Sequence, residues 1–196
     1  MARQAINIGT IANDGTGDPL RDAMDKVNDN ETELYGALGW GNYSDSLASP
    51  ATITLNTTPT LLLIDGLGGT SESGYLPREI RGVSELWDGV DTITPINTGD
   101  SYDVRFTLGI TAKSGSPNVI TAVLDIGIGA GITINIAQSQ APVVIAPPFT
   151  ITKNIPIFTL ATFIANGGRI FLSVDSGTIT IGERSIFIKR DFNGNL

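Results

Sequence analysis

The chain has 196 residues, a net charge of −8 and only 16% charged residues, and it contains neither His nor Cys. With 12 basic residues against 20 acidic ones, the composition argues against nucleic acid and anionic membrane surfaces as partners, because phosphate binding needs clustered Lys and Arg. Without Cys there is no disulfide and no thiolate chemistry, and without His the commonest general base and the commonest transition-metal ligand are absent. We expect no membrane span, because no apolar run approaches about 18 residues, and no signal peptide, because the N-terminus lacks an apolar h-region.

The first predicted element is a helix over about residues 18–36. Asp18 followed by Pro19 is typical of a helix N-cap and first turn, and Gly36 and Gly39 stand where the helix should end. Apolar residues recur at the heptad spacing of a coiled coil, with Glu31 at one position of the repeat. They form what we call the apolar stripe: Leu20, Met24, Val27, Leu34 and Leu38. Isolated helices of this length are marginal in water, so the stripe needs a partner, either the same chain or other copies of it.

The remainder of the chain predicts strands. Residues 40–50 are rich in Gly, Ser and Asn and indicate a linker, which separates an N-terminal segment (1–39) from a β domain (51–196). Strands are predicted at 52–56, 61–64, 91–94, 102–111, 119–128, 132–136, 150–153, 157–164, 170–175, 178–181 and 185–189, the last two joined by a tight turn at 182–184. Many short strands without intervening helices favour a mainly β chain, an antiparallel jelly-roll-like β-sandwich with a short N-terminal α-helix.

Several predicted strands are apolar on both faces, notably within residues 119–128, 141–149 and 154–168. An antiparallel sandwich normally leaves one face of each sheet in water. The surplus therefore predicts an interface with another protein chain, and a trimer of sandwiches would bury it. A helix or long loop of the same chain that covers the sheet is the alternative.

The polar positions at the front of the chain carry a resemblance. They read Ile6-Asn7-Ile8-Gly9, Asn13-Asp14-Gly15-Thr16-Gly17-Asp18, Leu20-Arg21 and Lys26-Val27-Asn28-Asp29-Asn30-Glu31-Thr32-Glu33-Leu34-Tyr35. This segment resembles the N-terminal attachment segment of phage virion proteins of baseplate and tail-fibre type, in which Phe is usual where Glu31 stands here.

The resemblance implies a virion structural protein, assembled in the host cytoplasm, that is a homotrimer and attaches to other virion proteins through its N-terminal segment. Baseplate, tail-fibre, neck or head-fibre, and capsid-decoration components all fit this description. Ile6, Ile8 and the apolar stripe are then the residues expected to carry oligomerisation and attachment.

Residues 67–89 form the longest stretch without alternation, and long ordered loops often carry function. Four of their side chains are candidates for contact with a receptor or a neighbouring protein: Tyr75, Arg78, Arg81 and Trp87. The alternative function is a lectin-like module that binds host surface glycan by stacking on loop aromatics. Those aromatics are Trp40, Tyr43, Tyr75 and Trp87, and their structural role would be loop packing.

The sequence predicts no catalytic residues, no cofactor and no metal site. The carboxylates Glu72, Glu79, Glu85, Asp88 and Asp91 could serve glycan hydrolysis, but no spacing singles out a pair. Asn13, Asp14 and Asp18 lack the length and the final Glu of an EF-hand loop, so we expect a turn. We expect Arg78, Glu79, Arg81 and Glu85 to form weak surface ion pairs. A monomeric β domain without an assembly role is a further alternative.

Overall fold

The computed structural model describes residues 4–10, 15–45, 51–66, 71–127, 132 and 134–194, without the side chains of 32–35 and 71. Helices in these ranges are α1 (Leu20–Ala37) and α2 (Ala161–Asn166). The strands are β1 (Gly39–Asp45), β2 (Ile53–Leu55), β3 (Thr60–Leu61), β4 (Ser71–Glu72), β5 (Thr92–Ile93), β6 (Ser101–Ser114), β7 (Val119–Asp125), β8 (Asn135–Pro142), β9 (Phe149–Phe158), β10 (Gly168–Val174) and β11 (Thr178–Phe192).

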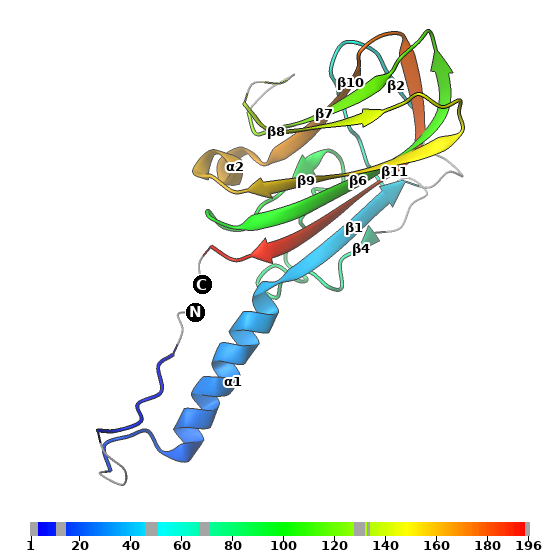
Figure 1. Ribbon diagram of the computed structural model, residues 1–196. Coiled ribbons are helices and arrows are strands. Elements are labelled where there is room, and N and C mark those ends of the chain that lie inside the picture. The colour runs from blue at the N-terminus through cyan, green and yellow to red at the C-terminus, as the bar shows by residue number, and fades with distance from the viewer. Residues whose placement is uncertain are drawn as a thin grey trace.

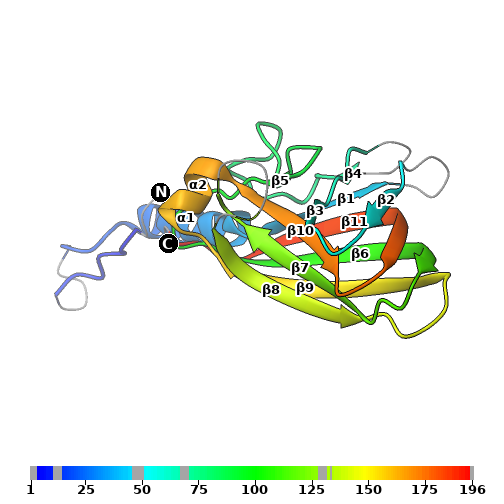
Figure 2. The same ribbon diagram turned by 90° about the horizontal axis from the view of Figure 1, so that it is seen from above.

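The strands form two antiparallel sheets that pack face to face (Figures 1 and 2). One sheet has the order β4-β1-β11-β6-β9, with β2 also paired to β11; the other has the order β3-β10-β7-β8, with β5 also paired to β10. The chain passes from one sheet to the other between β6 and β7, β8 and β9, β9 and β10, and β10 and β11, whereas β7 and β8 are neighbours in one sheet. The first strand, β1, lies beside the last strand, β11. This is the doubly crossed connectivity of a jelly roll, as the sequence predicted.

The core lies between the sheets and follows the predicted alternation. On β6 the five residues expected on one face, Tyr102, Val104, Phe106, Leu108 and Ile110, are all buried. β9 shows the same pattern, because Ile151, Ile155 and Ile157 point inward while Thr150, Thr152 and Asn154 are exposed. The sandwich therefore has one continuous apolar interior, which is what an independent domain of this size needs.

Helix α1 confirms the predicted helix but not its predicted cap. The N-cap is Pro19, in an extended conformation, and no side chain caps the helix. Asp18 instead contacts the chain that precedes the helix. In Figure 1, α1 extends away from the sandwich and meets it only at its C-terminal end.

Three predicted boundaries were wrong. Residues 40–45 are not a linker: they belong to β1, which pairs with β11 along its whole length, while residues 46–50 lie outside the described part of the chain. The predicted strand at 157–164 contains the end of β9 and the helix α2. The two strands predicted at 178–181 and 185–189 are one strand, β11, because a β-bulge between Ile181 and Arg184 absorbs the expected turn.

The local composition predicted the wrong structure at these places, because contacts with distant segments of the chain decide the structure there. On β1, Tyr43 and Asp45 are buried, and Asp45 Oδ2 lies 2.9 Å from Arg184 Nη2 on β11. This buried ion pair joins the two strands at a place where the sequence shows only small polar residues. Ile132 and Ile134, predicted on the inner face of a strand at 132–136, precede β8 and are exposed.

The expectation of sheets with two apolar faces was wrong for β9, whereas β7 is buried on both faces, because Val123 is buried as well as Ala122 and Leu124. The outer face of β9 is polar up to Pro156, and its surplus apolar residues belong to the end of the strand and to α2. Phe163 of α2 points into the core, whereas Leu160 and Ile164 are exposed. Val144 and Ile145, in the stretch before β9, are also exposed. Exposed apolar side chains thus gather at the ends of the sandwich instead of over a sheet.

Candidate assembly interface

The segment before the helix lies along α1 and is held there by polar side chains. Asn30 Oδ1 accepts a hydrogen bond from the Gln4 backbone N–H at 2.9 Å, and Asn30 Nδ2 donates to the Gln4 carbonyl at 2.9 Å. The Gln4 side chain donates to Asp29 Oδ2 at 2.8 Å. One amide side chain on the helix therefore pairs with the extended backbone as a neighbouring strand would. We call residues 4–10 and 15–37 the N-terminal arm.

A second contact holds the arm together at the start of α1. Asp18 Oδ2 accepts from the Asn7 backbone N–H at 2.9 Å, and the Asp18 N–H donates to the Asn7 carbonyl at 2.8 Å. Lys26 Nζ lies 2.6 Å from Asp18 Oδ2 and also donates to the Ala5 carbonyl at 3.2 Å. The hydrogen bond from Lys26, followed by that from Asn7, lowers the pKa of Asp18 below its ordinary value. Four polar residues of the quoted pattern, Asn7, Asp18, Lys26 and Asn30, are thus occupied within the arm.

The apolar residues of the arm are on the outside. Ile8 is 89% exposed and Leu20 is 79% exposed, while Met24 and Ile6 are 49% and 38% exposed. Val27 is half-buried. The side chain of Leu34 lies outside the described part of the structure, although its backbone belongs to α1. At about 100° per residue, Leu20, Met24 and Val27 fall within about 60° of one another around the helix axis. The arm therefore satisfies its polar groups internally and presents apolar groups to solvent.

The C-terminal end of α1 is anchored in the sandwich by a buried arginine that sequence reasoning missed. Arg190, on β11, is fully buried, and its Nη1 donates to the Ala37 carbonyl at 3.1 Å. Its Nη2 lies 2.8 Å from Asp100 Oδ1, and Glu79 Oε1 accepts a second hydrogen bond from Nη1. The last turn of α1 has no basic residue of its own, so Arg190 supplies the cation that a helix C-terminus favours. The sequence does indicate this arginine, because Arg190 is a charged residue at an inward position of the alternating pattern Ile186, Ile188, Arg190.

The chain around this anchor is tightly packed. The Arg78 N–H donates to the Gly36 carbonyl at 2.7 Å, and the Trp40 N–H donates to the Tyr75 carbonyl at 2.9 Å. A Cβ atom at Gly39 would lie 2.5 Å from the backbone of Tyr75 and of Pro77. Only glycine fits where the helix passes into β1, and the direction of α1 relative to the sandwich is therefore fixed.

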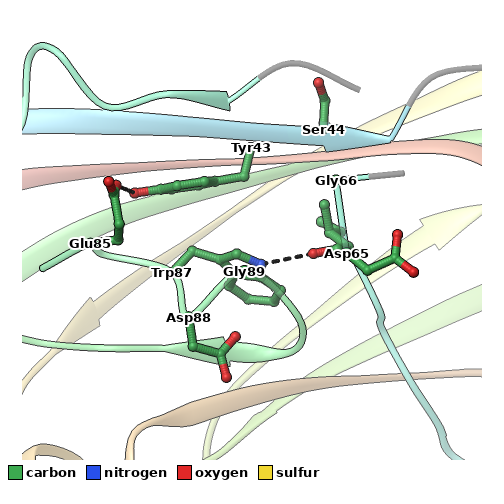
Figure 3. A pocket seen from close by; sticks show the side chains of 9 residues that line it. Tyr43, Ser44, Asp65, Gly66, Glu85, Trp87, Asp88 and Gly89 are labelled. Atoms are coloured by element: carbon green, nitrogen blue, oxygen red, sulfur yellow. Dashed lines mark hydrogen bonds between the residues drawn. The ribbon is translucent and has the colours of Figure 1, made fainter. Parts of the chain in front are cut away.

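The structure exposes some of the predicted receptor-contact residues and buries others. Tyr75 is 58% exposed and stacks on Trp40, with ring centroids 4.8 Å apart. Trp87 was wrongly placed: it is 1% exposed, and its indole N–H donates to the Ile64 carbonyl at 3.0 Å (Figure 3). Trp87 cannot touch a receptor because its ring fills the core. Tyr43 is likewise buried, and its hydroxyl donates to Glu85 Oε2 at 2.8 Å.

The expected surface ion pairs were also wrong. Glu79 pairs with the buried Arg190, and Glu85 accepts from Tyr43. Arg81 donates from Nε and Nη2 to the Leu76 carbonyl, at 3.0 and 2.7 Å, so it closes a loop. Arg78 is exposed. These side chains shape residues 76–85 around the anchor of α1 and do not form an independent charged surface.

A cavity of about 270 Å³ beside Trp87 is lined by two of the candidate carboxylates, Glu85 and Asp88 (Figure 3). Asp88 Oδ1 accepts backbone N–H groups of Val90, Asp91 and Thr92 at 2.8 to 3.0 Å, so Asp88 closes a turn. Within the described residues no three His, Cys, Asp or Glu side chains are grouped as metal ligands. Asn13 and Asp14, where the sequence predicts a turn instead of a calcium loop, lie outside those residues. In the same described part of the chain, no helix is both long and apolar enough to cross a membrane.

Comparison with known proteins relates this architecture to phage proteins. The family described as bacteriophage T4 gp9/10-like protein, N-terminal, matches residues 3–153, which include the arm and the strands through the first half of β9. The baseplate wedge protein gp10 of Enterobacteria phage T4 is 42% identical over 59 residues, which are 30% of this chain and 10% of that protein. The matched region therefore spans only a tenth of the length of this relative.

Solved structures with a similar fold are distant in sequence. Eiger TNF from S. frugiperda is 12% identical with a TM-score of 0.44, over 80% of this chain and 94% of that chain. The PRD1 vertex protein P5 is 13% identical with a TM-score of 0.44, over 79% of this chain and 97% of that chain. The family match covers well over half of the sequence, and the chain belongs to the bacteriophage T4 gp9/10-like family of phage structural proteins.

Proposed function

We propose that the chain is a structural component of the phage virion that assembles as a homotrimer and attaches to other virion proteins through its N-terminal arm. A baseplate, tail-fibre, neck or head-fibre, or capsid-decoration position fits this role, and the role is mechanical instead of catalytic. One observation carries the proposal: the polar groups of the arm are paired with one another, while Ile8, Leu20 and Met24 are exposed.

The energetics favour association over a free arm. Full burial of a Leu, Ile or Met side chain contributes about 1.5–3 kcal/mol, whereas an exposed helix of this length is marginal. In a parallel three-helix arrangement each copy covers the apolar stripe of the next. Docking of the same stripe into another virion protein uses the same side chains, and the resemblance of residues 6–35 to trimeric attachment segments favours the homotrimer.

The test uses the full chain in a dilution series measured by multi-angle light scattering. We expect the wild type to have three times the chain mass of 20.6 kDa, and Leu20→Asp/Met24→Asp to have the mass of one chain. Val144→Asp, which alters an equally exposed residue beyond β8, is the matched control and keeps the wild-type mass. Particles assembled with the double variant should lack the protein. A monomeric wild type, or a double variant that still forms trimers, contradicts the trimer.

A second candidate function has one observation in its favour. Aromatic side chains cross the outer face of the β1–β11 pair, where Trp40 stacks on Tyr75 and lies 5.4 Å from Phe187. Arg105 lies 4.7 Å above the Phe187 ring. An exposed aromatic beside hydrogen-bonding side chains suits a sugar of the host surface. A glycan array of the purified chain tests this role: binding that Tyr75→Ala abolishes supports it, and an array without signal rules against it.

A further inference from the structure

A second group of exposed apolar residues lies at the end of the sandwich from which α1 extends. We call it the base patch, and its members are Leu38, Phe158, Leu160, Ile164 and Phe192, which are between 36% and 60% exposed. Phe192 and Phe158 both pair with Ser101, one from each side, so the two rings flank the start of β6. Leu160 and Ile164 follow in the next turn of chain, where the Ile164 N–H donates to the Leu160 carbonyl at 3.1 Å.

The base patch is continuous with the apolar stripe along the chain. Leu38 belongs to both, because it ends the stripe and immediately precedes Gly39, which pairs with Arg190 two residues before Phe192. In Figures 1 and 2 the end of α1, the end of β11 and α2 lie at the same end of the molecule. Lys189 and Asp191, 2.7 Å apart, are exposed charges at the margin of the patch. An apolar centre with charges at its edge is the usual anatomy of a protein interface.

The anchor of α1 connects the two surfaces mechanically. Arg190 holds the Ala37 carbonyl and Asp100 within a network that is fully buried. Asp100 in turn accepts from the Tyr102 hydroxyl and the Gly194 N–H, each at 2.8 Å. The helix therefore cannot turn independently of the base of the sandwich. When α1 helices of several copies meet, the ends of the sandwiches that carry them are brought together.

The area of the stripe alone is too small for a stable interface. A fully buried aliphatic side chain removes about 60–120 Å² of apolar surface from water. Four such residues in α1 supply less than about 480 Å² per chain, against about 800 Å² per partner in stable interfaces. Phenylalanine side chains bury about 150–250 Å² each when fully covered. Phe158 and Phe192 are a little over half exposed, so covering them supplies a large part of the interface area that the stripe lacks.

We infer that the base patch is a second contact between copies of this chain, formed together with the apolar stripe of α1. The inference rests on the proposed trimer and extends its interface from the arm to the sandwich. The occupant of the patch is the base of a neighbouring copy, because the anchored helices bring equivalent ends of the chains to one axis.

The test compares two double variants of the full chain by light scattering over a dilution series. Phe158→Asp/Phe192→Asp should raise the concentration at which the trimer dissociates at least tenfold, and Val144→Asp, at the opposite end of the sandwich, should leave it unchanged. If Leu20→Asp/Met24→Asp dissociates the trimer while the base variant associates like the wild type, the inference is wrong and the proposed function stands. If the wild type is monomeric at every concentration, both are wrong.

A crosslinking measurement covers the case in which the base variant misfolds. The chain contains no Cys, so a single introduced thiol reacts without background. Phe158→Cys should be linked between copies by a short bismaleimide reagent, and Val144→Cys should not. A Phe158→Cys protein that forms trimers but gives no covalent dimer would overturn the inference.

Discussion

The sandwich and the N-terminal arm use their side chains in opposite ways. In the sandwich, apolar residues such as Phe106 and Ile188 are buried and the outer face of β9 is polar. In the arm, Asn30 and Asp18 make the internal contacts, while Leu20 and Ile8 face solvent. The sandwich thus completes its structure alone, and the exposed apolar groups of the arm are the basis of the proposal that another chain covers them.

The contrast also explains why the arm is joined to the sandwich by an ionic anchor. A flexible linker would let each arm take many orientations relative to its sandwich. Arg190 instead holds the end of the helix, at Ala37, beside Asp100 of the sandwich. An arm that points in one direction loses less conformational entropy when it associates. In the proposed trimer the anchor therefore lowers the entropic cost of assembly although it adds no contact between chains.

The largest expected effect is on the sandwich. Phe106→Ala removes a fully buried ring and should lower the free energy of unfolding by about 3–5 kcal/mol. Leu20→Ala, in the arm, should change the unfolding of the monomer by less than about 0.5 kcal/mol, as surface substitutions usually do. Urea unfolding of dilute protein, followed by tryptophan fluorescence, measures both. Equal losses in the two variants would mean that the arm is part of the cooperative core.

A smaller effect should appear at Glu31, the charged position of the stripe. Glu31→Leu replaces an exposed carboxylate with an apolar side chain at the centre of the proposed helix contact. The association constant should rise by at least about tenfold, which corresponds to 1.4 kcal/mol. Sedimentation equilibrium measures the change, and Asp22→Leu, elsewhere on α1, is the control. An association constant that does not move for Glu31→Leu would place the contact on another face of the helix.

A third effect should be confined to the arm. Asn30→Ala removes both hydrogen bonds to the Gln4 backbone, which together contribute about 1–3 kcal/mol if each is typical. Hydrogen exchange at the Gln4 amide should accelerate, while amides of β6 keep their protection. Asn28→Ala, which changes an exposed asparagine of the same helix, is the control. Unchanged protection at Gln4 would show that the segment is held by other contacts.

The smallest effect is a pH dependence of the arm. Because Lys26 and the Asn7 N–H lower the pKa of Asp18 below 3.8, its contribution is present above that pH and is lost as the pH falls through the lowered pKa. The Asn7 amide resonance should therefore shift in acid, and Asp18→Asn should show the acid-like position at neutral pH. The Asn118 N–H, which donates to Asp175 at 2.9 Å, reports on the sandwich for comparison. An Asn7 resonance that shifts neither in acid nor in Asp18→Asn would contradict the hydrogen bond between the Asn7 N–H and Asp18.

Much of this architecture follows from the sequence alone. Period-two alternation identified the inward face of β6, and apolar periodicity with Gly36 and Gly39 identified α1 almost to its ends. The polar pattern of residues 6–35 led to the family. These features are local, because each depends on residues near one another in the chain and on the geometry of a single element.

Only the tertiary structure decided the rest. β1 is a strand because β11 lies beside it, although its own residues suggest a linker. Trp87 fills the core because its loop folds back over Ile64. Arg190 and Asp100 are 90 residues apart in the chain. The local sequence around each residue does not predict that the two form a buried pair or that this pair anchors a helix. The sequence identified α1 and several of the long strands, because their patterns are local. Which side chains meet depends on contacts between distant segments, and those contacts decide where the charges and exposed apolar groups lie.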